Sequence, residues 1–166
     1  MENFTLSLEV QNNEKPRIVL PELFKPFVGA SKKIEGVQFG NVVFALHDAP
    51  KLLNYNQAVD YCRSCLIDGK QCSLLKSFDL TRKINLWDSH LNRYLVFFDL
   101  LNQALLASGG KTVLGYFYWV DMPVGYEKDY LWDHTRRLMR LQNGTIIFCD
   151  EKFMANVRPV LMLENV

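Results

Sequence analysis

The last apolar run of the chain limits the fold more than any other segment. Residues 157–163 read Val-Arg-Pro-Val-Leu-Met-Leu, which is typical of a strand deep in a sheet. Chain ends fray unless something ties them down, so we expect this strand to pair with another. Pro159 has no amide hydrogen, so its nitrogen side must face away from a ladder bond or lie at a bulge. Two roles remain open for Arg158, a buried guanidinium bonded to carbonyls or an acid, and a solvated side chain.

Composition indicates one globular domain with a sizeable core. The chain has 166 residues, 49% of them hydrophobic and 13% aromatic, with a formal net charge of +1. This balance gives no electrostatic reason to expect nucleic acid or an anionic membrane as a partner. Residues 1–17 contain no apolar stretch typical of an export signal, and no run approaches the roughly 18 apolar residues of a membrane span. We expect a chain that is cytoplasmic when made.

Residues 1–35 are predicted to form an arm that packs on a main domain of residues 36–166. The sequence FTLSLEV alternates like an edge strand, and Pro16, Pro21 and Pro26 are expected to interrupt regular structure after it. The apolar stretch IVLPELFKPF suggests that the arm mediates homo-oligomer formation.

The pattern next predicts short strands and a first helix. Residues 36–46 read as two short strands, or as one strand bent at Gly40. Asn54 is a suitable N-cap for a helix whose apolar face recurs at helical spacing through Ala58 and Cys62.

A longer helical region follows, with Ser77 as its cap, a break near residues 88–89 and a stop at Gly109-Gly110. Its predicted core stripe consists of Leu80, Ile84, Trp87, Leu91, Leu95, Phe98, Leu101 and Leu105.

Short strands then complete an α+β layout. Residues 113–120 read as an aromatic-rich strand, and residues 130–142 and 145–150 flank Asn143-Gly144, a strong hairpin signal.

The four cysteines, Cys62, Cys65, Cys72 and Cys149, are predicted to be reduced structural thiols. The C-x-x-C pair has no second ligand pair at zinc-binding spacing. Whether the first three bind a metal stays open, and no cofactor is predicted.

The order of these signals resembles the C-type-lectin-like fold of bacterial and phage proteins, including the variable proteins of diversity-generating retroelements. Leu75 and Asp79 depart from that family's second-helix start. The matching pieces are YNQAVDYC at 55–62, LNQALLASGG at 101–110, Tyr118-Trp119, Leu131-Trp132, Asn143-Gly144 and Val157-Arg158-Pro159-Val160.

The resemblance implies two helices on a mainly antiparallel sheet, with the terminal strand pairing with Val42–Leu46. It also implies that residues 121–133 lie where such domains display ligand contacts. Tyrosine suits that role because it offers a large contact area at low entropic cost. The candidate ligand-binding residues are Asp121, Tyr126, Glu127, Lys128, Tyr130 and Trp132. We therefore expect a non-catalytic module for a protein or glycan ligand, of the kind found in phage-like particles and adhesins.

Other functions carry less support from the residues. The segment lacks the Pro-flanked acid-amide pair of calcium-dependent sugar-binding members. Formylglycine-generating oxygenases share the broad fold but use two cysteines near the C-terminal end, where this chain has Cys149 alone. A small enzyme using Cys149 and His134, and an assembly component joined through the arm, remain as alternatives. We expect Trp119 in the core, and the run DHTRR at 133–137 on a solvated face.

Overall fold

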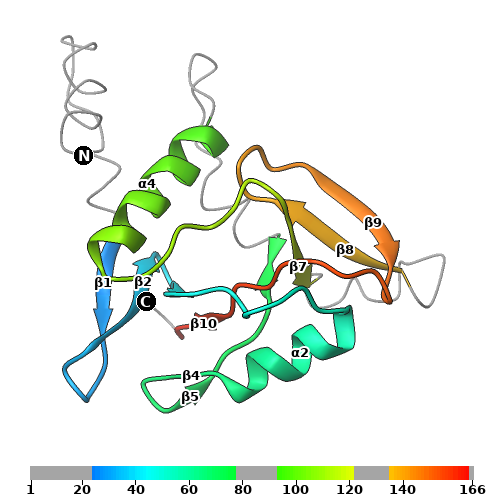
Figure 1. The fold of residues 1–166 in the computed structure, drawn as a ribbon. Helices are drawn as coiled ribbons and strands as arrows, with labels where there is room; N and C mark the ends of the chain where they lie inside the picture. The colour runs from blue at the N-terminus through cyan, green and yellow to red at the C-terminus, as the bar shows by residue number, and fades with distance from the viewer. Residues whose placement is uncertain (1–23, 78–92, 122–134, 165–166) are drawn as a thin grey trace, which may run out of the picture.

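The computed structural model describes residues 24–77, 93–121 and 135–164. These parts form an α+β structure with helices α2 (Tyr55–Ser64) and α4 (Arg93–Ala107) and mostly antiparallel strands (Figure 1). The strands are β1 (Phe24–Val28), β2 (Ile34–Phe39), β3 (Val42–Ala45), β4 (Leu66–Ile67), β5 (Lys70–Gln71), β6 (Leu75–Lys76), β7 (Phe117–Asp121), β8 (Thr135–Arg140), β9 (Ile146–Asp150) and β10 (Val160–Met162). No helix in the described ranges is long and apolar enough to cross a membrane.

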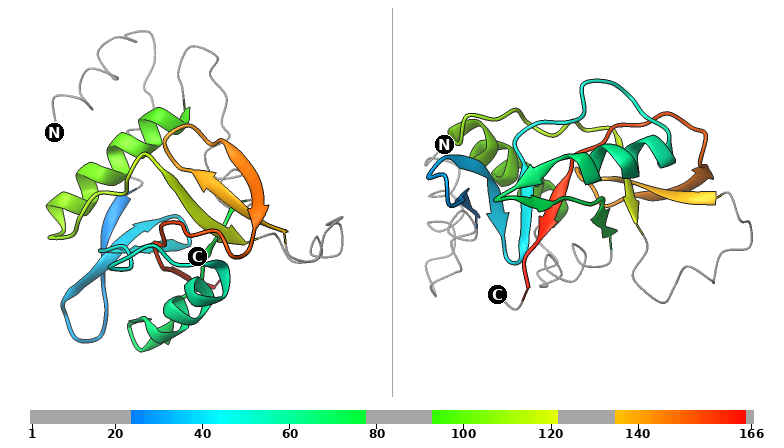
Figure 2. Two further views of the ribbon diagram at one scale, coloured as in Figure 1. Left: turned by 45° about the vertical axis from the view of Figure 1, so that its right-hand side comes forward. Right: turned by 90° about the horizontal axis from the view of Figure 1, so that it is seen from below.

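The terminal strand pairs with an early strand, as the sequence predicted. The first sheet has the order β1-β2-β3-β10, and β10 runs antiparallel to β3 with Val160 opposite Phe44. Figure 2 shows β10 in red beside β3. Pro159 lies just before the strand, where only its carbonyl is needed, and that carbonyl accepts a hydrogen bond from the Ala45 amide. The ladder therefore tolerates the missing donor.

Two short strands form at residues 34–45, and Gly40 lies in the turn between them. Its φ of 61° is one that glycine adopts without strain, which suits the first central position of a two-residue hairpin turn. The prediction that Pro26 interrupts regular structure is wrong. Pro26 lies within β1, the outer strand of this sheet, where a missing amide donor leaves no gap between paired strands. Residues 24–28 and 34–35 thus belong to the sheet, while residues 1–23 lie outside the described part.

The second sheet has the order β6-β7-β8-β9, with β6 parallel to β7 and the other pairs antiparallel. The predicted hairpin at Asn143-Gly144 is confirmed, with a loop longer than two residues. The Gly144 amide donates to the Arg140 carbonyl at 2.8 Å, and Gly144 alone of residues 141–144 has a positive φ, of 78°. The Asn143 side chain accepts from the Thr145 amide. Asn143 and Gly144 are therefore the last two residues of the loop and do not form its centre.

The start of α2 and the end of α4 lie where the sequence predicted them. The expectation that Asp68-Gly69-Lys70 closes the first helix is wrong, because α2 ends at Ser64 and residues 66–71 form the β4–β5 hairpin. Asn54 caps α2, and the Asn54 and Gln57 side chains each accept from the other residue's backbone amide. Beyond α4, the Gly109 amide donates to Leu106 and the Gly110 amide to Leu105, with Gly109 at φ 87°. This is the Schellman pattern that glycine favours.

The buried face of α4 differs from the predicted stripe. Leu95 is 42% exposed, whereas Val96 and Phe97 are buried, so the apolar face is rotated relative to the predicted one. Leu101 and Leu105 are buried as predicted. The helix is apolar on most sides, and periodicity therefore cannot fix which side meets the sheet. Leu80, Ile84, Trp87 and Leu91 lie outside the described residues.

The second sheet separates two hydrophobic clusters. Tyr118 and Met139 face the cluster shared with α4 and the first sheet. Trp119 and Leu138 face the cluster shared with α2. Trp119 is 1% exposed and its Nε1 donates to the Leu53 carbonyl at 2.8 Å, so its predicted core role is confirmed.

Candidate functional site

The best candidate site lies where β7 and β8 end. These strands are antiparallel neighbours, with Val120 opposite Arg137, so residues 122–134 begin and end at adjacent positions of one sheet. Asp121 is the one predicted ligand-binding residue in the described ranges. The other predicted residues of this segment, Tyr126, Glu127, Lys128, Tyr130 and Trp132, lie outside the described residues.

A second segment leaves the sheet at the same end. β6 runs parallel to β7 with Lys76 opposite Asp121, and residues 78–92 follow directly after Ser77. Ser77 is fully buried, and Arg137 Nη1 donates to its hydroxyl at 2.8 Å. Residues 78–92 and residues 122–134 therefore begin at neighbouring strands of the same sheet.

Tyr55 connects this end of the sheet to α2. Its hydroxyl donates to Asp121 Oδ1 at 2.7 Å, and its ring lies edge-on to Trp119 with centroids 5.6 Å apart. Tyr55 is the first residue of α2, directly after the Asn54 cap. The cap thus fixes the helix start, and the helix start fixes the position of the hydroxyl.

Arg136 and Glu151 complete what we call the polar cluster, which consists of Tyr55, Asp121, Arg136 and Glu151. The Arg136 guanidinium lies 4.8 Å from the centroid of the Tyr55 ring and forms an ion pair with Glu151 at 3.3 Å. The Tyr55 amide donates to the Glu151 carbonyl at 2.9 Å. Helix α2, strands β7 and β8 and the turn after β9 therefore meet at this cluster.

Burial sets the charge state of the cluster. It raises the pKa of the Asp121 carboxyl above the usual value, against the opposing effects of the Tyr55 hydroxyl and of nearby Lys76, Arg136 and Arg63. Burial and the neighbouring Asp121 also raise the pKa of Tyr55, which keeps the phenol protonated as a hydrogen-bond donor. This arrangement orients a carboxyl and an aromatic ring on a rigid support.

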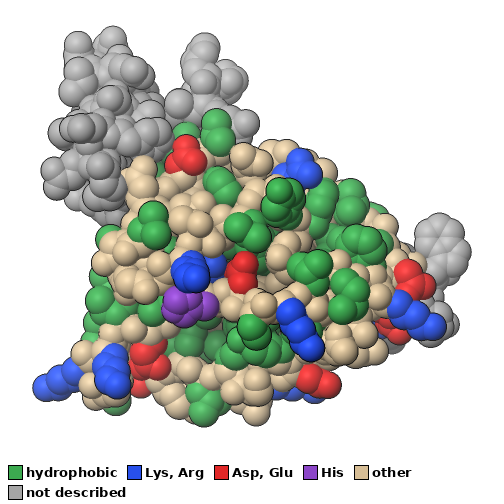
Figure 3. Space-filling model, in the orientation of Figure 1, with side chains coloured by type: hydrophobic (Ala, Val, Ile, Leu, Met, Phe, Trp, Pro, Cys, Tyr) green, Lys and Arg blue, Asp and Glu red, His purple; other side chains and the backbone are tan. Residues whose placement is uncertain are grey.

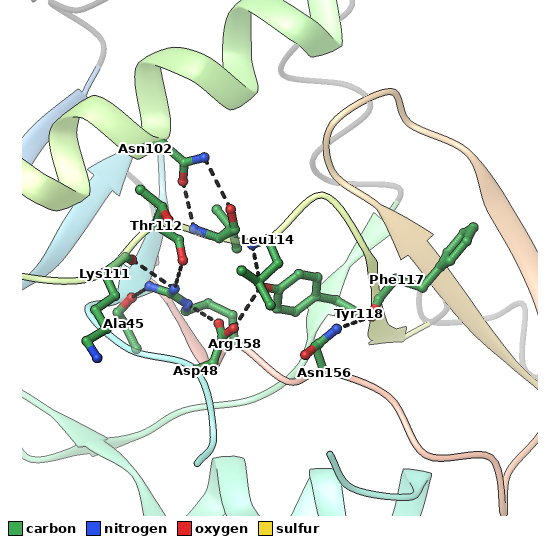
Figure 4. Close-up of polar contacts among 11 residues, drawn as sticks. Ala45, Asp48, Asn102, Lys111, Thr112, Leu114, Phe117, Tyr118, Asn156 and Arg158 are labelled. Carbon is green, nitrogen blue, oxygen red and sulfur yellow. Dashed lines mark hydrogen bonds and ion pairs between the residues drawn. The ribbon is translucent and has the colours of Figure 1, made fainter. Parts of the chain in front are cut away.

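A second polar network fixes the chain that leads into β7 (Figure 4). Arg158 is 4% exposed and pairs with Asp48, while its two Nη atoms donate to the carbonyls of Ala45, Lys111 and Thr112. The first of the two roles left open for Arg158, the buried guanidinium, is thus the observed one.

Tyr118 extends this network into β7. Its hydroxyl donates to Asp48 Oδ2 at 2.8 Å and accepts from the Leu114 amide at 2.7 Å. The Asn102 side chain of α4 forms two hydrogen bonds with the backbone of Val113. Irregular residues 111–116 are therefore bonded to both a helix and the core, which fixes the start of β7.

Of the two residues of the alternative enzyme function, Cys149 lies in the described ranges. Cys149 lies on β9 opposite Arg136, and burial together with the neighbouring Asp150 raises the pKa of its thiol. A raised pKa disfavours the thiolate that a nucleophilic cysteine needs. His134 lies outside the described residues.

The remaining cysteines are free thiols around the end of α2, with Cys62 and Cys72 buried. Within residues 24–77, 93–121 and 135–164, no group of three His, Cys, Asp or Glu side chains is arranged to hold a metal ion.

Sequence reasoning missed most of the polar cluster. The prediction that residues 133–137 form a solvated face is wrong for Arg136 and Arg137, which are half-buried and bonded to Glu151 and Ser77. The capped helix start was a signal for the place of Tyr55, whereas nothing local connects Glu151 with Arg136. On the face drawn in Figure 3, basic and acidic side chains are scattered among hydrophobic ones.

In a scan against protein-family models and a search of curated proteins, nothing matched this chain.

Proposed function

We propose that this protein is a non-catalytic binding module of C-type-lectin-like architecture, in which residues 121–133 supply the contact surface for a protein or glycan ligand. The proposed contacts are Asp121, Tyr126, Glu127, Lys128, Tyr130 and Trp132. A phage-like particle or a surface adhesin is the proposed setting.

One observation carries the proposal: both ends of residues 122–134 are fixed at adjacent positions of the sheet. Asp121 is tied to Tyr55 of α2, and Arg136 is tied to Glu151 beyond β9. Binding residues are commonly carried on segments that a rigid scaffold positions. Fixed ends reduce the conformational entropy that such a segment loses when a ligand binds.

The composition of the segment supports recognition rather than catalysis. Its sequence, MPVGYEKDYLWDH, combines two tyrosines and a tryptophan with charges of both signs. Aromatic rings with polar tips suit binding surfaces for proteins and for the apolar faces of sugars.

The architecture supports the C-type-lectin-like part of the proposal. Pairing of β10 with β3 closes the domain as that resemblance implies, with two helices between the early strand and β7. The proposed contact segment then follows the first long strand of the second sheet.

A binding screen tests the proposal. The tagged full chain is applied to glycan and protein arrays, and any ligand found is titrated against the wild type and a Tyr126→Ala, Tyr130→Ala variant. We expect the double variant to bind about tenfold or more weakly, because aromatic anchors dominate most interfaces. Thermal unfolding of both proteins checks that the frame is intact.

Tyr116→Ala is the matched control. Tyr116 is 66% exposed and lies outside the proposed segment, so its loss should leave the affinity unchanged. Equal affinities of the double variant and the wild type, or a similar loss in Tyr116→Ala, would contradict the proposed site. The absence of any ligand on either array would count against both proposed ligand classes.

A further inference from the structure

Three cysteines gather where α2 ends and the β4–β5 hairpin begins. Cys62 lies in the last turns of α2, Cys65 directly follows the helix as its C-cap, and Cys72 directly follows β5. The hairpin is closed by Asp68 and Gly69, both with positive φ, at 53° and 74°. A short turn of this kind holds the two flanking residues close together.

Cys65 and Cys72 face each other across this hairpin. Leu66 pairs with Gln71 and Ile67 with Lys70, and the Cys72 amide donates to the Cys65 carbonyl at 3.0 Å, which extends the ladder by one more pair. Opposed residues in a hydrogen-bonded antiparallel pair have Cα atoms about 5.5 Å apart. A disulfide needs a Cα separation of roughly 4.4–6.8 Å. The Cα separation typical of such a pair lies within this range.

Packing favours this pair over the C-x-x-C pair. Cys72 is buried in a cluster with Val43, Ile67 and Leu161, and Cys65 packs against the same cluster. Cys62 belongs to a different hydrophobic cluster, with Trp119 and Leu74. The two thiols of the C-x-x-C sequence are thus directed into different clusters, whereas Cys65 and Cys72 share one.

We propose that Cys65 and Cys72 form a reversible intramolecular disulfide by exchange with a low-molecular-weight disulfide such as oxidised glutathione. Cys65 is half-buried and meets the oxidant first, whereas Cys72 is only 3% exposed. The Cys65 thiolate attacks one sulfur of the oxidant, the oxidant's S–S bond breaks, and one small thiol leaves. The Cys72 thiolate then attacks the Cys65 sulfur and releases the second small thiol. The protein loses two protons and two electrons, and the oxidant is reduced to two thiols.

The second step depends on the Cys72 thiolate. Burial and the neighbouring Cys65 raise the pKa of the Cys72 thiol to about 12. Little Cys72 thiolate is therefore present, and the mixed disulfide at Cys65 should resolve faster as pH rises.

The disulfide would fix the chain that leads to the candidate site. Ser73 follows Cys72 directly and forms two backbone hydrogen bonds with Val160, and β6 begins two residues later beside β7. The disulfide would thus cross-link the end of α2 to the segment that bonds to β10 through Ser73 and places Lys76 opposite Asp121.

Tryptic mapping of the full chain distinguishes every pairing. Cleavage at lysine and arginine places Cys62, Cys65, Cys72 and Cys149 in separate peptides, 52–63, 64–70, 71–76 and 141–152. The native protein is incubated with oxidised glutathione, quenched with acid and an alkylating agent, and digested without reduction. We expect a cross-link between peptides 64–70 and 71–76, with a higher yield than in the urea-unfolded chain.

Single variants test the order of the two steps. Cys62→Ser and Cys149→Ser should keep the cross-link, because neither thiol takes part. Cys72→Ser should accumulate glutathione on peptide 64–70, and Cys65→Ser should remain reduced at residue 72. A dominant link between peptides 52–63 and 64–70 would overturn the proposal. So would a native chain that stays reduced, or keeps glutathione on Cys65 without a cross-link, under conditions that oxidise the unfolded chain.

Discussion

Arg158 and Asp48 form an ion pair in the interior, with Arg158 Nε 2.6 Å from Asp48 Oδ1, although 110 residues of chain separate them. Three further Arg158 donors are taken by the carbonyls of Ala45, Lys111 and Thr112. These acceptors come from the last residue of β3 and from the irregular residues before β7. One guanidinium thus joins three parts of the chain that have no sequence relationship.

Replacing Arg158 with alanine should destabilise the protein by about 3–5 kcal/mol, because Asp48 and three carbonyls lose a buried partner. Arg158→Lys should cost less, since it keeps the charge but cannot serve acceptors on several sides. Urea unfolding monitored by tryptophan fluorescence measures both. Arg63→Ala, at an exposed arginine of α2, is the matched control and should change the free energy of unfolding by less than about 0.5 kcal/mol. An equal loss in the two alanine variants would contradict the assigned role of Arg158.

Tyr118→Phe should lower the free energy of unfolding by about 1–3 kcal/mol, because Asp48 loses a donor and the Leu114 amide loses its acceptor. The ring itself is retained, so the change isolates the hydroxyl. Tyr116→Phe removes the same atom from a tyrosine that is 66% exposed and should be neutral. Chemical denaturation of the two variants side by side provides the measurement, and a neutral Tyr118→Phe would show that the hydroxyl network contributes little.

Asp121 should make the folded state less stable as pH rises. Its folded-state pKa lies above the ordinary value of 3.8, so the folded protein binds the proton more tightly than the unfolded chain. Stability from this group is therefore present below about pH 4 and is lost as pH rises through the raised value. Asp121→Asn removes this loss. The stability of the variant relative to wild type should increase between about pH 3 and pH 8, measured by urea unfolding at each pH. A difference that stays flat, or that decreases with pH, would contradict the raised pKa.

Gly144→Ala should be more destabilising than Gly69→Ala. Both glycines have positive φ, 78° and 74°, so both substitutions carry the same backbone strain of about 1 kcal/mol. A Cβ at residue 144 would lie 2.7 Å from the Tyr94 ring, whereas one at residue 69 would have no atom within 4 Å. Thermal unfolding of the two variants gives the difference, which is the cost of moving Tyr94. Equal shifts in Tm would mean that the Tyr94 ring moves aside at no measurable cost in stability.

The elements that the sequence predicted well are those with local chemical signals. Asn54 caps a helix, Gly109 ends one, and Asn143-Gly144 closes a hairpin, because each residue satisfies backbone groups only a few positions away. The pairing of the last strand with β3 was also predicted, from its apolar sequence and from a family resemblance.

What could not be predicted depends on contacts between distant segments. The side of α4 that is buried is decided by the sheet it meets, so the exposure of Leu95 cannot be assigned from periodicity alone. Arg136 meets Glu151 only because β8 and β9 pair in one register. Nor does the sequence near Arg158 reveal that its acid is Asp48.

The β3–β10 ladder also sets the order of events when the chain is synthesised. Strand β3 leaves the ribosome long before β10, and until then one side of β3 has no neighbour. Folding that depends on such distant partners is slow and leaves apolar strands open to wrong contacts. Until β10 emerges, the free side of β3 is therefore open to incorrect pairing.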